Sequence, residues 1–271
     1  MTVAGLVTAF GSGAMTNSID EIEQTEVFLV TGSNTTENHP IVALRIKKAV
    51  REKGAKLIVI DPREIELAKI AHIWLRPTPG TDVIWLNGLM NVIIEEDLWD
   101  RTYVEERTEG FGSLKEAVKK YTPEYVEKLT GIPQDELREV ARIYASAGKA
   151  GIYYAMGITQ HVTGTDNVRS IANLAMLCGN VGVEGGGVNP LRGQNNVQGA
   201  CDMGALPNVY PGYQSVADLN IREKFEKAWG TDLCNSTGLV LTEVIDAAYR
   251  GDIQAMYLVG ENPVLSDPDA R

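Results

Sequence analysis

Short apolar runs that alternate with helical segments constrain the fold of this 271-residue chain more than any other feature of its sequence. The runs occupy residues 26–30, 56–60, 73–75 and 151–155. Apolar residues recur at helical spacing over residues 41–50, 65–70, 82–95 and 167–177. Strands that are apolar on both faces and joined by helices form parallel sheets with helices on both sides. We therefore expect an α/β fold with an αβα layered, mostly parallel sheet.

The last third of the chain predicts a different arrangement. Glycines and polar amides predominate between residues 178 and 203, where we expect no regular element. Beyond that run, residues 218–230 and 242–251 predict helices, and residues 256–259 predict another strand. We therefore expect an αβα domain over residues 1–190 and part of a second, similar α/β domain over residues 191–271.

Charge and composition exclude several classes of function. A net charge of -11 and a pI near 4.9 argue against general nucleic-acid binding, because phosphate backbones are held by clustered Lys and Arg. No apolar run approaches the ~18 residues of a membrane helix, and the residues after Met1 do not form a signal peptide. Cys178, Cys201 and Cys234 form neither a disulfide framework nor a CxxC metal site. We expect a cytoplasmic protein that binds neither nucleic acid nor membranes.

Polar loops follow the predicted strands at their carboxyl ends, where open parallel sheets bind ligands. Four loops should line one edge of the sheet: residues 32–38, 61–63, 156–160 and 260–263. Asn34 and Asn38 can donate to and accept from a nucleotide, and the helix starting near His39 presents free N–H groups to a phosphate. Asp61 can accept from ribose hydroxyls, and Arg63 can face a phosphate. One such loop alone is equally well explained as a turn, but four together favour a nucleotide site.

The signatures of the commonest nucleotide-binding folds are absent from this sequence. Gly32 does not begin a GxGxxG motif, and Gly11-Ser12-Gly13 follows no strand and lacks the third glycine in register. The chain has no Walker lysine either. A plain NAD enzyme and a P-loop enzyme are therefore disfavoured.

The segment from Asn189 to Gly204 is the most informative part of the sequence. Its glycines allow the backbone to approach a ligand closely, and its amides can bond the edge of a heteroaromatic ring. Arg192 supplies a planar fork that suits a small carboxylate. A polar loop of this length inside an α/β chain is usually functional, so a plain surface loop is the weaker interpretation.

Several motifs together resemble one family. They lie at residues 2–6, 11–17, 61–63, 189–204, 207–213 and 260–263. The chain resembles, over essentially its whole length, the alpha subunits of formate dehydrogenases, which are bis-molybdopterin guanine dinucleotide oxidoreductases. The most specific part of the resemblance is Arg192-Gly193-Gln194-Asn195-Asn196.

The resemblance implies a molybdenum or tungsten ion held by two pterin dithiolenes, at which formate is oxidised to carbon dioxide. Two electrons would then pass through a 4Fe-4S cluster to an electron-transfer subunit or iron-sulfur protein. The family's cysteine or selenocysteine metal ligand, its catalytic histidine and its cluster cysteines would lie upstream of Met1. We therefore expect an internal fragment that holds no metal by itself and is inactive alone.

Residue by residue, the resemblance assigns one catalytic position and a set of cofactor-binding positions. Arg192 would orient formate beside the metal. The cofactor-binding residues would be Gly32, Asn34, Glu37, Asn38, Asp61, Arg63, Gly80, Asp82, Met156, Gly157, Gln160, Gly193, Gln194, Asn195, Gly260, Glu261 and Asn262.

Two other functions stay open. One is a related molybdopterin enzyme that acts on an oxyanion such as nitrate, and the other is a non-catalytic nucleotide-binding or partner-docking module. His39, His72 and His161 lack ligand-like spacing, so we expect them to be solvated or helix-capping residues rather than metal ligands.

Overall fold

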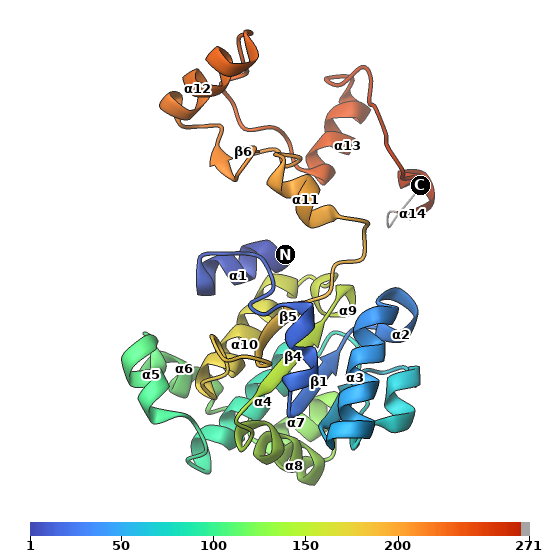
Figure 1. Cartoon of the computed structure of the whole chain (residues 1–271), viewed down its shortest axis with the longest axis vertical. Helices are drawn as coiled ribbons and strands as arrows, with labels where there is room; N and C mark the ends of the chain where they lie inside the picture. The colour runs from blue at the N-terminus through green and yellow to red at the C-terminus, as the bar shows by residue number, and fades with distance from the viewer. Residues whose placement is uncertain (267–271) are drawn as a thin grey trace. The chain divides into compact units, whose positions relative to one another are not determined.

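The computed structural model describes residues 1–266, and its first 195 residues are built around a five-stranded parallel sheet (Figure 1). The strands are β1 (Val27–Thr31), β2 (Lys56–Ile60), β3 (Ile73–Leu75), β4 (Ala150–Tyr154) and β5 (Gly187–Pro190). Their order in the sheet is β3-β2-β1-β4-β5, and every neighbouring pair is parallel. Because the strand order reverses beside β1, the carboxyl ends of β1 and β4 border the kind of crevice where such sheets bind ligands.

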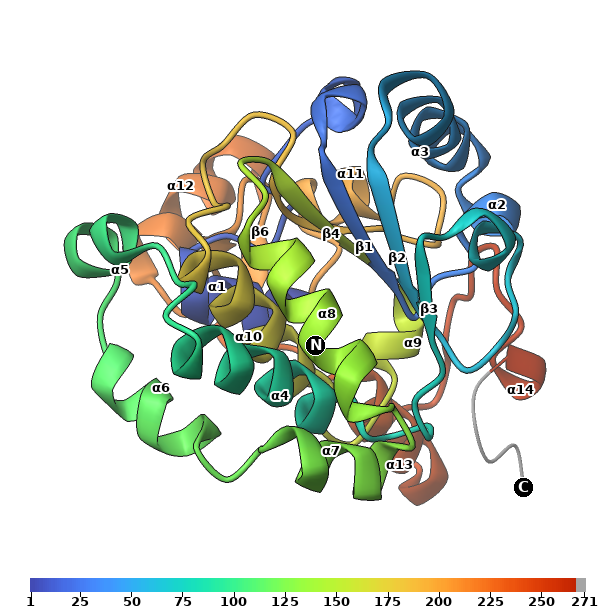
Figure 2. The same cartoon turned by 90° about the horizontal axis from the view of Figure 1, so that it is seen from below.

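Helices cover both faces of this sheet, as the continuous apolar strands predict. Residues Val27 and Leu29 of β1 join one hydrophobic cluster, whereas Phe28 and Val30 join the other. Side chains alternate along a strand, so both faces of β1 must be covered by other elements. Figure 2 shows α3 on one face and α4, α8 and α10 on the other. The αβα expectation is therefore confirmed.

The two helical layers differ in size. The smaller layer consists of α3 (Pro40–Lys53) with the 3-10 helices η1 (Ile19–Gln24) and η2 (Glu66–Ile70). The larger layer consists of α1 (Thr2–Phe10), α4 (Asp82–Glu95), α5 (Arg101–Arg107), α6 (Phe111–Val118), α7 (Pro123–Thr130), α8 (Gln134–Ala145) and α10 (Gly164–Leu177). Two short helices, α2 (Thr35–Asn38) and α9 (Met156–Thr159), follow β1 and β4 directly.

The glycine-rich run between residues 178 and 203 contains two elements, so the expectation that it holds no regular element is wrong. The first is the edge strand β5, whose Asn189 and Pro190 pair with Tyr153 and Tyr154 of β4. Proline is tolerated in an edge strand because one side of that strand needs no ladder hydrogen bond. The second is α11 (Val197–Asp202), where the Asn196 side chain accepts from the Gly199 backbone N–H.

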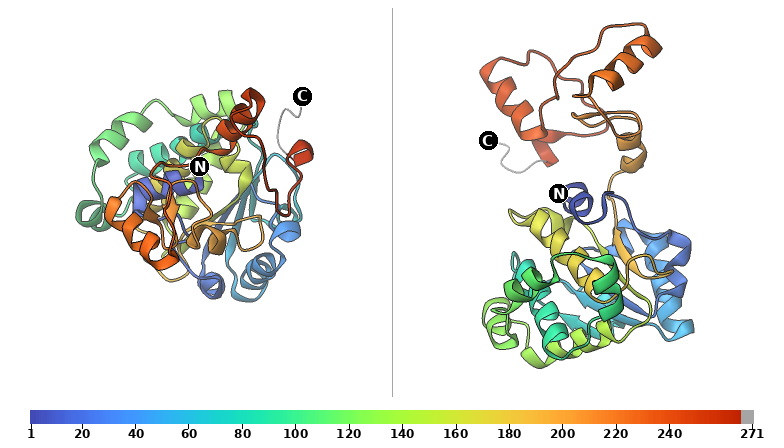
Figure 3. Two further views of the ribbon diagram at one scale, coloured as in Figure 1. Left: turned by 90° about the horizontal axis from the view of Figure 1, so that it is seen from above. Right: turned by 90° about the vertical axis from the view of Figure 1, so that its left-hand side faces the viewer.

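The chain divides into two compact units, residues 1–195 and 196–271. The domain boundary predicted from the sequence, between residues 190 and 191, stays a prediction. Within the second unit, β6 (Val209–Tyr210) and β7 (Gln214–Ser215) form a short antiparallel pair. The helices of this unit after α11 are α12 (Leu219–Trp229), α13 (Leu241–Arg250) and α14 (Pro263–Ser266), with a long irregular segment between α12 and α13 (Figure 3).

The strand predicted at residues 256–259 does not form. These residues have no regular structure, and Tyr257 and Val259 are 93% and 77% exposed. A strand needs a neighbour to satisfy its backbone groups, and the only strands in the described part of the second unit are the two-residue pair β6 and β7. None of the helices within residues 1–266 is long and apolar enough to cross a membrane.

Candidate functional site

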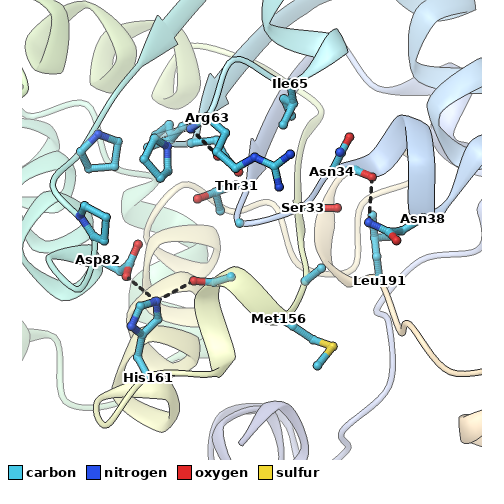
Figure 4. Close-up of a pocket in the computed structure, with 18 of the residues that line it drawn as sticks. Thr31, Ser33, Asn34, Asn38, Arg63, Ile65, Asp82, Met156, His161 and Leu191 are labelled. Carbon is cyan, nitrogen blue, oxygen red and sulfur yellow. Dashed lines mark hydrogen bonds and ion pairs between the residues drawn. The ribbon is translucent and has the colours of Figure 1, made fainter. Parts of the chain in front are cut away.

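A cavity of about 430 Å3 opens at the carboxyl ends of β1, β2 and β4 (Figure 4). It brings together three of the four loops that the sequence placed at this edge, together with the loop before α4. Ten of the predicted cofactor-binding residues line it: Gly32, Asn34, Asn38, Asp61, Arg63, Gly80, Asp82, Met156, Gly157 and Gly193. The fourth loop, at residues 260–263, follows no strand and belongs to the second unit.

Gly32 and Gly157 line the cavity where the loop after β1 contacts the loop after β4. The Gly157 N–H donates to the Gly32 carbonyl over 3.0 Å, and Gly32 has a φ of 55°. A Cβ atom on Gly32 would lie 2.6 Å from the Ile158 nitrogen, and one on Gly157 would lie 2.6 Å from the Gly32 Cα. Backbone and conformation therefore both require glycine at Gly32, and the contact between the loops leaves a backbone-lined surface against which a ligand can pack closely.

Asp61 and Arg63 lie in the loop after β2, on one side of the cavity. The Asp61 carboxylate accepts from the Arg63 backbone N–H over 2.9 Å, and the Arg63 side chain extends into the cavity, as Figure 4 shows. Asp61 is only 7% exposed, and burial raises the pKa of its carboxyl group. This arrangement offers a hydrogen-bond acceptor and a cation within one short loop.

Asp82 and His161 line the same cavity, across from Asn34 and Asn38 in Figure 4. Burial raises the pKa of the Asp82 carboxyl, which accepts from the Trp85 indole over 3.3 Å and is 9% exposed. The His161 Nε2 lies 2.9 Å from the Gly157 carbonyl and 3.7 Å from Asp82 Oδ2 (Figure 4). Because a carbonyl oxygen only accepts, Nε2 carries the proton. The His161 ring therefore lies between the Asp82 carboxylate and the backbone of Gly157, to which it donates.

Sequence reasoning missed both histidines that line this cavity, His39 and His161. Their positions in the chain carried a usable signal, because His39 lies one residue beyond the loop after β1 and His161 one residue beyond Gln160, at the end of the loop after β4. His72, in contrast, is exposed and is not among the lining residues of this cavity.

A second cavity, of about 310 Å3, contains Arg192, Gln160 and Gln194. The Arg192 Nη2 donates to the Gly13 carbonyl over 2.7 Å, while its buried Nε has no partner among the described residues. Tyr154 lies beside the arginine, and burial raises the pKa of its phenol. The two cavities share Ala155, Met156, Leu191 and Gly193 as lining residues, so they adjoin.

The remaining predicted residues are not among the lining residues of either cavity. Glu37 and Asn195 are exposed and line neither cavity, and Gly260, Glu261 and Asn262 are exposed in the second unit. Residues 1–266 contain no group of three or more His, Cys, Asp or Glu that could hold a metal ion. The first unit therefore offers carboxylates, an arginine and glycine backbone in one cavity, and a second arginine in the adjoining one.

Comparisons with known proteins agree on one family. The family model described as molybdopterin oxidoreductase matches residues 5–271. The chain is 53% identical over its full length to the alpha subunit of an F420-dependent formate dehydrogenase from Methanocaldococcus jannaschii. It is 50% identical to the alpha subunit of F420-dependent formate dehydrogenase 1 from Methanococcus maripaludis and 49% identical to formate dehydrogenase H from Escherichia coli, in each case over 99% of the chain.

These relatives are much longer proteins, because the chain spans only 38–40% of their length. Among solved structures, acetylene hydratase from Pelobacter acetylenicus superposes with a TM-score of 0.61 and 30% identity. That match covers 66% of this chain and 24% of the hydratase.

Proposed function

Because the chain belongs to the molybdopterin oxidoreductase family, we propose that it forms the cofactor-binding part of a formate dehydrogenase alpha subunit, which oxidises formate to carbon dioxide. The observation that carries this proposal is the 49–53% identity of nearly the whole chain to three formate dehydrogenases. The reaction is proposed for the complete subunit, since the chain spans only about 40% of those relatives.

Family membership implies a molybdopterin cofactor that carries molybdenum or tungsten. We propose its bis-guanine dinucleotide form, because the donors and acceptors of the larger cavity suit a nucleotide. The buried Asp82 carboxylate would accept from the N–H groups of a guanine edge, and Asp61 from ribose hydroxyls. Arg63 would face a phosphate, and Gly32 and Gly157 would let the backbone approach the ligand.

Arg192 would bind the substrate in the adjoining cavity. Its guanidinium has five N–H donors, of which one hydrogen bond to Gly13 uses a single donor, so others remain for the formate carboxylate. Gln194 and Asn195 would contact the pterin side of the cofactor, and Gln160, which lines the same cavity as Arg192, stays a predicted cofactor contact. The metal-pterin group, when bound, accepts the two electrons that formate loses. Arg192 would hold formate in a fixed orientation toward it.

The onward electron path extends the proposal to partners. We propose a 4Fe-4S cluster elsewhere in the complete subunit and an electron-transfer subunit or iron-sulfur protein beside it. Coenzyme F420 is a candidate final acceptor, since the names of two relatives include it. Glu37 and the loop from Gly260 to Asn262 stay predicted cofactor contacts. A cytoplasmic location also stays a proposal, supported by three cysteines that are all unpaired thiols.

Guanine nucleotide binding tests the cavity assignment on the 271-residue chain itself. Isothermal titration calorimetry should detect GDP binding that is at least tenfold tighter than ADP binding, because a buried carboxylate matches the paired N–H donors of guanine. Asp82→Asn should remove most of that preference, whereas Asp166→Asn, at an exposed position on α10, should not. Equal affinity of the wild-type chain for GDP and ADP would contradict the assignment.

Formate kinetics of the complete subunit test the reaction. Arg192→Lys replaces a bidentate partner with a point charge, and losing one charge-assisted hydrogen bond costs about 1.5 to 3 kcal/mol. Formate turnover should therefore fall roughly tenfold or more, with molybdenum or tungsten content unchanged. A subunit that reduces nitrate and does not oxidise formate would instead support the related oxyanion enzyme.

A further inference from the structure

His39 connects the two cavities through one hydrogen bond. Its side chain lines the larger cavity, and its Nε2 lies 2.7 Å from the backbone carbonyl oxygen of Arg192, 153 positions along the chain. A carbonyl oxygen only accepts, so Nε2 is the donor. The other ring nitrogen, Nδ1, is buried and has no partner among residues 1–266. The single bond to Arg192 therefore sets the orientation of this imidazole.

The segment that carries Arg192 has few other restraints. Residues 191–196 belong to no helix or strand. The Leu191 N–H donates to the Tyr154 carbonyl over 2.7 Å, which continues the ladder between β4 and β5. Arg192 itself is held at two points, by its Nη2 on the Gly13 carbonyl and by its own carbonyl on His39. His39 therefore supplies one of the two attachments that fix this arginine.

We propose that His39 is a positioning residue that couples occupancy of the dinucleotide cavity to the placement of Arg192. A nucleotide packed against the cavity wall would restrict the imidazole, and the imidazole would in turn restrict the Arg192 backbone. This coupling rests on the proposed function, because it takes the larger cavity to be the nucleotide site. It differs from the role of Arg192 itself, since His39 lines the cavity assigned to the nucleotide and not the cavity assigned to formate.

Limited trypsin digestion of the 271-residue chain measures how firmly Arg192 is held. Cleavage of the Arg192–Gly193 bond requires local opening that frees both the guanidinium and the carbonyl, so its rate follows the population of the open segment. Mass spectrometry of the product spanning residues 1–192 gives this rate. Cleavage after Lys227, in α12, serves as the internal reference.

Two substitutions of His39, one that removes its hydrogen bond to Arg192 and one that keeps it, separate the effect of this bond from a general structural role of His39. A glutamine amide nitrogen can reach the position of Nε2, whereas the shorter asparagine places its amide near Nδ1. His39→Asn should therefore speed cleavage at Arg192 roughly twofold to tenfold, the range expected for one lost hydrogen bond. His39→Gln should restore most of the protection. His72→Asn, at an exposed histidine, is the matched control and should change nothing.

Adding GDP tests the coupling. In the wild-type chain and in His39→Gln, saturating GDP should slow cleavage at Arg192 at least threefold, but in His39→Asn it should have little effect. Wild-type cleavage rates in His39→Asn would overturn the positioning role, and equal GDP protection of His39→Asn and wild type would overturn the coupling. If calorimetry shows no GDP binding to the wild-type chain, the nucleotide assignment fails and the coupling fails with it, while the digestion without nucleotide still decides the positioning role.

Discussion

The two units of the chain bury their apolar residues to very different extents. In the first unit every residue of β1 is buried between two hydrophobic clusters. In the second unit, residues 196–266 bury only Cys201, Tyr210, Phe225 and Ala247. On α13 of the same unit, Leu241 is 61% exposed and Tyr249 94% exposed. A stable unit must offset its conformational entropy by apolar burial, so the first unit has a core of its own and the second has little.

The largest expected effect follows when the units are separated. Residues 1–195 alone should unfold in one cooperative urea transition, because both sheet faces keep their helical cover. Residues 196–271 alone should show no cooperative transition. Circular dichroism during urea titration measures both, with the intact chain as reference. A sharp transition in the isolated second unit would remove the contrast between the units.

A matched pair of truncations sharpens the contrast in the intact chain. Ile58→Ala removes a fully buried side chain from β2 and should destabilise the first unit by about 2 to 5 kcal/mol. Leu241→Ala removes a mostly exposed side chain from α13 and should cost less than about 0.5 kcal/mol. Urea midpoints of the main transition give both values. Similar costs at the two positions would show that α13 is packed as tightly as the sheet.

Alanine substitutions at two glycines of the first unit, one in the site and one on the surface, should lower the free energy of unfolding by different amounts. Both Gly32 and Gly11 have positive φ values, but a Cβ on Gly32 would clash with Ile158 backbone and one on Gly11 would meet open space. Gly11→Ala should cost about 1 kcal/mol from conformation alone. Gly32→Ala should cost at least about 2 kcal/mol, since the contact between the loops must also shift. Thermal unfolding measures how much stability each variant loses. Equal losses in the two variants would argue against a rigid contact between the loops at Gly32 and Gly157.

The smallest expected effect is the dependence of folding stability on pH, to which the carboxyl groups of Asp82 and Glu21 contribute with opposite signs. Burial raises the pKa of Asp82 above its ordinary value of 3.8, so the native state binds more protons and stability falls as pH rises from about 3.8 through the native pKa. At Glu21, hydrogen bonds from Ser18 and Asn17 lower the pKa from 4.5 to about 2, so stability is lost as pH falls through that range.

Replacing each carboxyl group by an amide should remove its contribution to the pH dependence of stability. Asp82→Asn should flatten the decline above about pH 3.8 and slightly stabilise the chain at neutral pH, while Glu21→Gln should flatten the loss in acid. Urea midpoints at a series of pH values compare the variants with wild type. An Asp82→Asn variant that is clearly less stable at neutral pH would contradict the idea that its buried charge is costly.

The sequence alone determined the central sheet and much of the larger cavity. The runs at β1, β2, β3 and β4 are apolar on both faces, which only a covered parallel sheet satisfies, and this pattern placed Asn34, Asp61 and Met156 at one edge. The same pattern gave a wrong prediction at residues 256–259, which are apolar but form no strand. A strand forms only where a neighbouring strand can pair with it, and the local sequence does not say whether such a neighbour exists.

Only the tertiary structure decided how distant segments meet. The edge strand β5 owes its existence to its pairing with β4, since Gly187 and Pro190 are poor strand formers by themselves. His39 and His161 each lie next to a predicted loop in the sequence, but only the packing of the loops brings both to one cavity. The hydrogen bond between His39 and Arg192 spans 153 residues, and no periodicity or local propensity encodes a contact of that separation.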